Sequence, residues 1–284
     1  MKLTAARIRG FQRKINDYYR THKRDFPWRE TRDPYAILVS EMMLQQTQAE
    51  RVIPKYLEWM KKFPTPASLS NAKVSDVLKM WQGLGYNRRA LNLRRAAEMI
   101  VNECKGEFPK ELAEIDALPG VGPYTAGAIA AFAFNVPSVF IETNIRTVYL
   151  HFFCKGKTKV RDEEILELVE CTLPVKQHSD ILQNVGMSDG QGRVREWYNA
   201  LMDYGAMLKS TIGNPNIHST SYAKQSKFKG SRRELRGAIL KKAALQSSVF
   251  VRDITSKNYS VADIFAELVT EGFLKKKGNA FILA

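Results

Sequence analysis

The sequence predicts a mainly α-helical protein that ends in a small α+β module. Apolar residues recur at helical spacing from the N-terminus to about Met207, and alternating strand patterns are scarce in this part. The last segment differs, because SVADIFAELVTEGFLKKKGNAFILA has the pattern of a capped helix, a strand, a Lys-Gly-Asn turn and a final strand. A chain of 284 residues can form one large domain, or two domains of which one is small.

The helical part is expected to span residues 1–210. Asp33 and Pro34 predict a helix start, with an N-cap followed by proline at the first helical position. Further helical patterns are VSDVLKMWQ, RALNLRRAAEMIVNEC, ELAEIDAL, YTAGAIAAFAF, TNIRTVYLHFF, DEEILELVECTL and REWYNALMDYGAML. The linkers between them are short and rich in Gly, Pro or Asn, which is typical of a domain with many packed helices.

The remaining chain divides into a linker and a module. Residues 211–229 begin polar and become basic, and residues 230–284 are expected to form a small winged-helix-like unit. An α+β appendage with only a packing role is an equally good interpretation of the second stretch.

Composition favours an acidic macromolecular partner. Lys and Arg number 44 against 29 Asp and Glu, which gives a net charge of +15 and a pI near 9.7. Such an excess favours nucleic acid, although a merely basic soluble protein is the alternative. We find no apolar run long enough to span a bilayer and no apolar signal core near the N-terminus. We therefore expect a cytoplasmic, nucleoid-associated or nuclear monomer that does not bind membranes.

Cysteine usage argues against a metal centre. Cys104, Cys154 and Cys171 lie far apart, with no C-x-x-C or other metal-type spacing. The expectation is three reduced thiols and no metal site.

The stretch LPGVGPYTAGAI at residues 118–129 predicts a tight hairpin that leads into a helix. Gly120 and Gly122 tolerate positive φ and leave the backbone N–H groups accessible to a phosphate at the helix start. The hydroxyl of Thr125 adds a possible donor. The alternative is an ordinary helix–helix turn, but the helical patterns on both sides favour phosphate binding.

These residues carry a specific resemblance. LPGVGPYTAGAI resembles the helix-hairpin-helix of the DNA glycosylase superfamily that includes endonuclease III. FPWRETRDPYAILVSEMMLQQTQAERVIPKY, WQGLGYNRRALNL and MDYGAML resemble adenine DNA glycosylases of the MutY type, in order from about residue 25 to 208. The resemblance implies two helical lobes with a DNA-facing cleft, and an enzyme that flips one base out of the duplex.

Glu41 is the first catalytic candidate. Its helical neighbours Ile37, Leu38 and Leu44 are apolar, so we expect desolvation to raise its pKa and suit it to act as a general acid. The resemblance assigns it the protonation of adenine at N7. From the pattern alone, a partly buried glutamate paired with an arginine would be the simpler interpretation.

Glu142 is the second candidate, in VFIETNIRTV. In the superfamily this place is occupied by an aspartate that stabilises the sugar cation, and an Asn or His follows shortly after it. In this chain Asn144 occupies the second position. Glutamate keeps the charge but is one methylene longer. Either the pocket is rebuilt around it, which we favour, or activity is weakened or redirected. A surface glutamate at a helix start is the less favoured alternative.

Tyr124 stands at the hairpin exit, where bifunctional members carry a lysine that forms a Schiff base with the sugar. Tyrosine cannot form one, so the resemblance implies a monofunctional glycosylase that leaves an abasic site. A helix-start aromatic used only for packing is the alternative.

The remaining candidates would read bases or bind the backbone. The resemblance places Gln46 and Thr47 against the base opposite the adenine, Tyr86 as a wedge in the stack, and Trp28 and Arg29 near the flipped adenine. For each, surface polarity or core packing is the alternative. We also expect Gln45 to contact a base, Asn144 and Arg88 to contact DNA, and Leu44 to line the base pocket. Arg88, Arg89, Arg94 and Arg95 form either a phosphate-contacting face or a solvated one.

Two family features are missing from this sequence. Most adenine glycosylases carry a four-cysteine iron–sulfur loop after the GAM segment, where Lys209 stands here. We expect no cluster, and the basic residues of 222–242 either replace it as a phosphate clamp or form a flexible linker. The nudix-like domain that recognises 8-oxoguanine has no counterpart in these residues.

The sequence therefore predicts excision of adenine opposite 8-oxoguanine or guanine, without a cofactor, from double-stranded DNA. A thymine or uracil mismatch glycosylase of the same superfamily and a non-catalytic DNA-binding relative are the alternatives.

Overall fold

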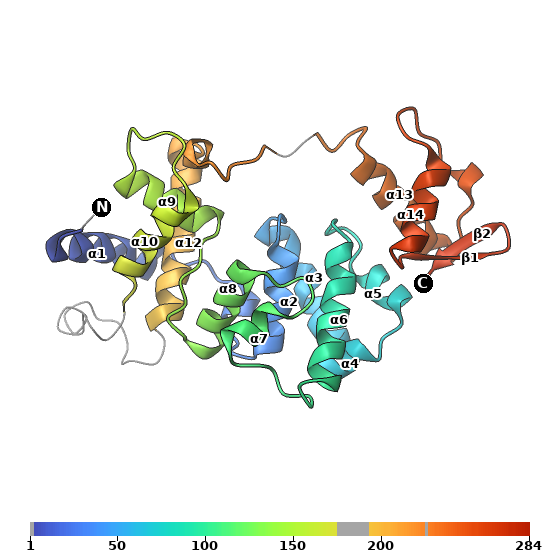
Figure 1. The fold of residues 1–284 in the computed structure, drawn as a ribbon, viewed down its shortest axis with the longest axis horizontal. Helices are drawn as coiled ribbons and strands as arrows, with labels where there is room; N and C mark the ends of the chain where they lie inside the picture. The colour runs from blue at the N-terminus through green and yellow to red at the C-terminus, as the bar shows by residue number, and fades with distance from the viewer. Residues whose placement is uncertain (1–2, 175–192, 225–226) are drawn as a thin grey trace. The chain divides into compact units, whose positions relative to one another are not determined.

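The computed structural model describes residues 3–174, 193–224 and 227–284 and confirms the mainly helical fold class (Figure 1). Two short strands close the chain. The α-helices of the first half are α1 (Ala5–His22), α2 (Pro34–Leu44), α3 (Ala49–Lys62), α4 (Pro66–Ser70), α5 (Val74–Met80), α6 (Arg88–Asn102), α7 (Leu112–Asp116) and α8 (Pro123–Phe134). Those of the second half are α9 (Thr143–Phe153), α10 (Asp162–Thr172), α12 (Arg193–Ile212), α13 (Arg232–Gln246) and α14 (Val261–Thr270).

Three short 3₁₀ segments and one hairpin complete the described elements. The segments are η1 (Pro27–Arg29), η4 (Pro215–His218) and η5 (Val251–Asp253). The strands β1 (Leu274–Lys277) and β2 (Ala280–Leu283) pair antiparallel, with Leu274 opposite Leu283. Gly278 takes a positive φ of +60° in the two-residue turn between them, as the Lys-Gly-Asn pattern predicts.

The chain forms two compact units that interleave along the sequence. Unit 1 comprises the described residues within Met1–Ile37, Lys110–Ala117 and Val121–Ala223. Unit 2 comprises those within Leu38–Pro109, Leu118–Gly120 and Lys224–Ala284. Helix α2 begins in unit 1 and ends in unit 2. It starts where predicted, at Pro34, and the Asp33 carboxylate accepts the N–H of Tyr35 at 3.0 Å.

The core of unit 1 is built where α1 and α9 pack against α12. Phe11 of α1 meets the ring of Trp197 on α12 edge-on at 5.7 Å and the ring of Tyr149 on α9 at 5.5 Å. All three rings are buried. Gly205 of α12 allows the close approach of α9, because a Cβ atom there would lie 2.2 Å from the carbonyl oxygen of Asn144.

The core of unit 2 is built from α3 to α6 and from the C-terminal residues. Trp59 and Trp81 are fully buried and pack edge-on at 5.4 Å. The C-terminal elements follow the order helix, isolated bridge, helix, hairpin, and Val249 bridges Phe281 of β2. Both α13 and β2 contact α5, so the predicted 230–284 module lies within unit 2. Gln225 and Ser226 of the predicted 211–229 linker lie outside the described residues.

Candidate functional site

The candidate residues divide between the two units. Glu142, Asn144, Tyr124, Thr125 and Gly122 belong to unit 1, together with Trp28 and Arg29. Glu41, Leu44, Gln45, Gln46, Thr47, Tyr86, Arg88 and Gly120 belong to unit 2. The two carboxylates expected to act on one nucleotide therefore come from different units.

Glu142 is the N-cap of α9, and its position is fixed by the backbone of that helix. Its Oε1 accepts the N–H of Asn144 at 2.8 Å and that of Ile145 at 3.0 Å. The side-chain amide of Asn144 donates to Oε2 at 3.4 Å. A carboxylate is a favoured cap because it satisfies N–H groups that have no partner within the helix.

Burial dominates the electrostatics of Glu142. Desolvation raises the pKa of its carboxyl, against the lowering effects of the two backbone hydrogen bonds and of the positive charges of Lys209 and Arg146. Lys209, on α12, is affected in the opposite sense. Burial lowers the pKa of its ammonium, and the negative charge of Glu142 partly restores it. Lys209, which follows the GAM segment, thus contributes positive charge beside Glu142.

The hairpin uses a positive φ at only one of its two glycines. Gly120 has a φ of +82°, and Gly122 is the extended N-cap of α8, with Pro123 at the first helical position. A Cβ on Gly120 would lie 2.7 Å from Cβ of Asn92 and 2.8 Å from Cε of Met42, so only glycine fits there. Tyr124 is 47% exposed at the start of α8, and Thr125 follows it half-buried. Tyr124 therefore does not serve as a buried packing residue of unit 1.

Trp28 and Arg29 have structural partners within unit 1. Trp28 is buried and stacks on Phe26 at 4.9 Å. Arg29 donates to both carboxylate oxygens of Asp203, at 2.8 and 2.9 Å, and to the carbonyl of Arg24. Burial raises the pKa of Asp203, but its hydrogen bonds and charge attraction to Arg29 and Arg24 hold it below its usual value. Contact of Arg29 with a base remains a prediction, and any such contact would come from an arginine already held by Asp203.

Arg89 organises the loops that carry the base-reading candidates. It is buried, and burial lowers its pKa to about 10. Its Nη1 donates to the carbonyls of Met42, Met43 and Gln45 at 2.6–2.9 Å, which lie at the C-terminal end of α2. Its Nη2 donates to Thr47 Oγ1 and to the carbonyls of Leu84 and Gly85. One guanidinium thus ties the LQQT turn to the GLGY loop.

This arrangement corrects one sequence interpretation. The sequence predicts that Arg88, Arg89, Arg94 and Arg95 form one phosphate-contacting or solvated face, but Arg89 is buried. Arg94 donates to the carbonyls of Ala72 and Ser70 and pairs with Glu98. The sequence could not indicate this, because the carbonyls that bind the two side chains come from other segments. Arg88 is exposed, and it forms an ion pair with Glu271 at 2.9 Å.

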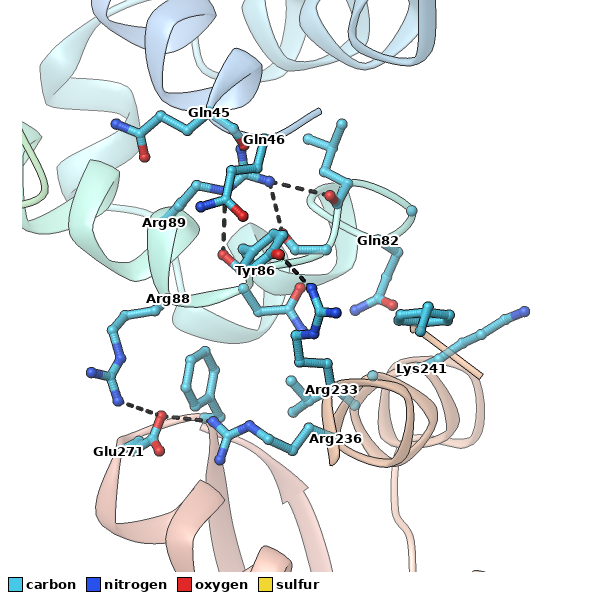
Figure 2. A pocket seen from close by; sticks show the side chains of 18 of the residues that line it. Gln45, Gln46, Gln82, Tyr86, Arg88, Arg89, Arg233, Arg236, Lys241 and Glu271 are labelled. Carbon is cyan, nitrogen blue, oxygen red and sulfur yellow. Dashed lines mark hydrogen bonds and ion pairs between the residues drawn. The ribbon is translucent and has the colours of Figure 1, made fainter. Parts of the chain in front are cut away.

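A pocket opens in unit 2 beside these loops. Its volume is about 1170 Å³, and polar side chains dominate its wall (Figure 2). We call it the arginine pocket. It is lined by Gln45, Gln46, Arg51, Gln82, Gly83, Leu84, Gly85, Tyr86, Asn87, Arg88, Arg89, Asn92, Phe228, Arg232, Arg233, Arg236, Gly237, Leu240, Lys241, Glu267, Glu271 and Phe273. Of the base-reading candidates, Gln45, Gln46, Tyr86 and Arg88 meet here. The lining residues from α13 and from the end of α14 are not among the predicted site residues. The basic composition of 222–242 indicates only those from α13, and no sequence signal indicates Glu267 and Glu271.

Thr47 and Glu41 are not among the residues that line the pocket. Thr47 accepts the hydrogen bond of Arg89 described above, and Glu41 lies half-buried one turn before the end of α2. Gln45 donates to the carbonyl of Gly120 at 3.4 Å, which connects the LQQT turn to the hairpin within unit 2.

Comparison with known proteins finds one family that matches the central part of the chain. The family described as "HhH-GPD superfamily base excision DNA repair protein" matches residues 39–171. This region contains Glu41, the LQQT and GLGY segments, the hairpin and Glu142.

Curated relatives that are similar to this chain are named adenine DNA glycosylases. The chain is 36% identical to that of Buchnera aphidicola subsp. Baizongia pistaciae over 166 residues, which cover 58% of this chain and 47% of the relative. It is 44% identical to that of Mycobacterium tuberculosis H37Rv over 132 residues, covering 46% of this chain and 43% of the relative. The human enzyme is 40% identical over 152 residues, covering 50% of this chain and 28% of the relative. The chain thus spans about half or less of the length of these relatives.

Solved structures agree on the fold. A thermostable thymine-DNA glycosylase aligns with a TM-score of 0.58 and 27% identity, covering 71% of this chain and 87% of that one. Endonuclease III, in a trapped covalent intermediate with DNA, aligns with a TM-score of 0.55 and 19% identity, covering 72% and 88%. None of the helices among the described residues is long and apolar enough to cross a membrane.

Proposed function

We propose that this chain is a monofunctional DNA glycosylase that hydrolyses the N-glycosidic bond of adenine mispaired with guanine or 8-oxoguanine. The observation that carries the proposal is the similarity to adenine DNA glycosylases over a region that holds both candidate carboxylates. The substrate is double-stranded DNA, in keeping with the net charge of +15, and the chain is proposed to act as a monomer.

The proposed chemistry uses the two carboxylates in different roles. Glu41 protonates adenine at N7, which turns a poor leaving group into a good one as the C1′–N9 bond breaks. Glu142, whose Oε1 accepts two backbone N–H groups at the start of α9, in its ionised form stabilises the positive charge that develops on the sugar. Water adds to C1′ and completes the hydrolysis. Base flipping is required, because the bond is hidden in the stacked duplex.

Tyr124 limits the reaction to base removal. A phenol cannot form the Schiff base through which a lysine at this place permits strand cleavage. The product is therefore an abasic site in an intact strand. We also propose that the chain acts without an iron–sulfur cluster, on the ground of its cysteine spacing.

A single-turnover assay tests the proposal. Duplexes with A:8-oxoguanine, A:G, T:G and U:G pairs are incubated with the chain, and each sample is divided and analysed with and without alkali. Strand breaks in the adenine duplexes after alkali alone are expected. Breaks without alkali would refute the monofunctional assignment. Binding with no excision, unchanged in Glu41→Gln, would indicate a non-catalytic relative.

The second candidate function is thymine or uracil excision from mismatches with guanine. The 27% identity to a thymine-DNA glycosylase over 71% of the chain favours considering it. Product from the T:G or U:G duplexes alone would establish this function in place of adenine excision.

A further inference from the structure

Helix α13 contributes an arginine to the wall of the arginine pocket. Arg233 donates from Nη1 to the hydroxyl of Tyr86, and its guanidinium carbon lies 5.6 Å from the centre of the Tyr86 ring (Figure 2). The two residues are 147 positions apart in the sequence. Because α13 lies outside the matched residues 39–171, the family resemblance assigns this arginine no role.

The backbone of Tyr86 is held in a conformation that few side chains adopt. Its φ is +46°, and it follows Gly83 and Gly85, which have φ of +95° and +73°. The carbonyl of Tyr86 accepts the backbone N–H of Arg89 at 3.0 Å and its Nε–H at 3.4 Å. A positive φ in a tyrosine costs about 1–3 kcal/mol and persists where surrounding contacts enforce it. Here these contacts hold Tyr86, which is 37% exposed, at the wall of the pocket.

The pocket combines the groups that recognise a nucleobase. The side-chain amides of Gln45, Gln46 and Gln82 can both donate and accept, Tyr86 offers an aromatic face, and Arg233 offers a planar pair of donors. The carboxylates Glu267 and Glu271 pair with Arg232, Arg236 and Arg88 on the same wall. These ion pairs hold the neighbouring arginines in place around Arg233.

The base that this pocket could take is not the excised one. Glu41, the group proposed to protonate the leaving adenine, is not among the described residues that line the pocket. The other base of the mismatch is a guanine or its oxidised form. The edge of guanine presents O6 and N7 as adjacent acceptors, which is the pattern that an arginine reads with two parallel hydrogen bonds.

The family resemblance already places Gln46 and Tyr86 beside the base opposite the excised adenine. We propose that Arg233 is a further specificity-determining residue at this place, and that it contacts O6 and N7 of an opposite guanine. This inference rests on the proposed adenine glycosylase function. It makes α13 a reading element for the opposite base. On binding DNA, Arg233 exchanges the Tyr86 hydroxyl for the base edge while Tyr86 stays in place.

DNA binding by the full chain tests the inference without requiring excision. The chain carries Glu41→Gln to block excision, and its affinity is measured by fluorescence anisotropy for duplexes with A:G and A:T pairs. We expect the unsubstituted Arg233 to give tighter binding to A:G. Arg233→Ala should reduce that preference by at least about fivefold, the lower end of what a bidentate arginine–guanine pair provides.

Two further variants separate reading from simple charge. Arg233→Lys keeps the positive charge but loses the planar fork, so it should lose the preference while keeping most of the affinity. Lys257→Ala removes the same charge from an exposed loop of unit 2 outside the pocket, and it should leave the preference unchanged. An equal loss of affinity for both duplexes in Arg233→Ala, or no preference for A:G at the outset, would overturn the inference.

The outcomes distinguish this inference from the proposed function. An Arg233-dependent preference for A:G supports the reading role even if the chain with Glu41 intact excises no adenine, which would remove only the proposed function. Conversely, adenine excision by a chain whose A:G preference does not depend on Arg233 would leave the proposed function in place and remove the reading role.

Discussion

The Glu142 site in unit 1 and the arginine pocket in unit 2 hold their charged groups in different ways. Glu142 is bound by two backbone N–H groups at the start of one helix. In the pocket, Arg88 and Arg236 both pair with the carboxylate of Glu271 (Figure 2). The three charged groups are at the ends of long side chains that come from different segments. Backbone donors cannot move independently of the helix, whereas side-chain ion pairs can exchange partners.

The difference matches the tasks proposed for the two regions. A carboxylate that stabilises a developing cation must stay within about 0.5 Å of its productive position. A surface that reads a base must release its own partners to take new ones. Arg89 is intermediate, because it is a side chain that binds only fixed acceptors: backbone carbonyls and one hydroxyl.

The largest effect should come from removing Arg89. This change tests whether the pocket wall depends on this one guanidinium. Arg89→Met keeps the apolar length but leaves several buried carbonyls without a donor. We expect the free energy of unfolding to fall by at least about 3 kcal/mol, measured by urea denaturation. Arg95→Met, an exposed change on the same helix, is the control and should stay within about 0.5 kcal/mol. Small and equal effects of Arg89→Met and Arg95→Met would show that the two loops are stable without the hydrogen bonds of Arg89.

The next effect concerns Glu142 itself. Glu142→Gln keeps an oxygen that can accept from Asn144 and Ile145 but removes the charge. The single-turnover rate of adenine excision should fall by at least about 100-fold while the melting temperature changes little. Glu142→Asp tests whether the pocket is built around the longer side chain, since a displacement of about 1 Å can cost a similar factor. Full activity in Glu142→Gln would exclude the proposed role.

A smaller effect should appear in the pH dependence. Burial raises the pKa of Glu142, and Lys209 opposes that rise. Because the role proposed for Glu142 requires its ionised form, the rate should increase as pH rises through this pKa. Lys209→Met removes the opposing charge and should move the acid limb of the pH–rate profile to higher pH, whereas Lys209→Arg should leave it in place. An unmoved limb in Lys209→Met would show that the lysine does not act on Glu142.

Stability should depend on pH in the opposite sense at this residue. A carboxyl whose pKa is raised by folding is favoured in its protonated form in the folded state. Its contribution to stability is therefore complete below the unfolded-state pKa and is lost as pH rises through the folded-state pKa. The ionised form needed for the reaction is the one that stabilises the fold least.

The smallest effect should follow from Glu271→Gln, which releases Arg88 and Arg236. Although burial raises the pKa of Glu271, its hydrogen bonds from these arginines hold it below its usual value. The Arg88 side chain is exposed, whereas Glu271 and Arg236 are half-buried, and a glutamine can still accept one hydrogen bond from them, so the stability change should be about 1 kcal/mol. Affinity for DNA should rise, with a steeper salt dependence, because more positive charge faces the phosphates. Weaker binding would indicate that Glu271 orders the wall.

Sequence reasoning predicted what depends on local pattern. The start of α2 at Pro34, the positive φ of Gly120, the serine-capped helix α14 and the β1–β2 turn all follow from neighbouring residues, and the structure confirms them. The family resemblance located Glu41 and Glu142, and their catalytic roles stay predictions.

Long-range partners could not be predicted in the same way. In NRRALNL, Arg88 and Arg89 are adjacent and identical residues, yet Arg88 is exposed, whereas Arg89 is buried and donates to carbonyls 44–47 residues away. The pairing of Arg29 with Asp203 spans 174 positions, and that of Arg233 with Tyr86 spans 147. Such contacts depend on how helices pack, which local periodicity does not encode.

The pairing of α1 with α12 also bears on how the chain is made. Arg24 follows α1, and its partner Asp203 lies 179 residues later. At a synthesis rate of about 5–20 residues per second, the first helix waits roughly 10–40 s on the ribosome for the helix that covers it. Its apolar face, including Phe11 and Ile15, is without that cover throughout this time. The nascent chain should therefore bind ribosome-associated chaperones through this apolar face, which is buried once the protein has folded.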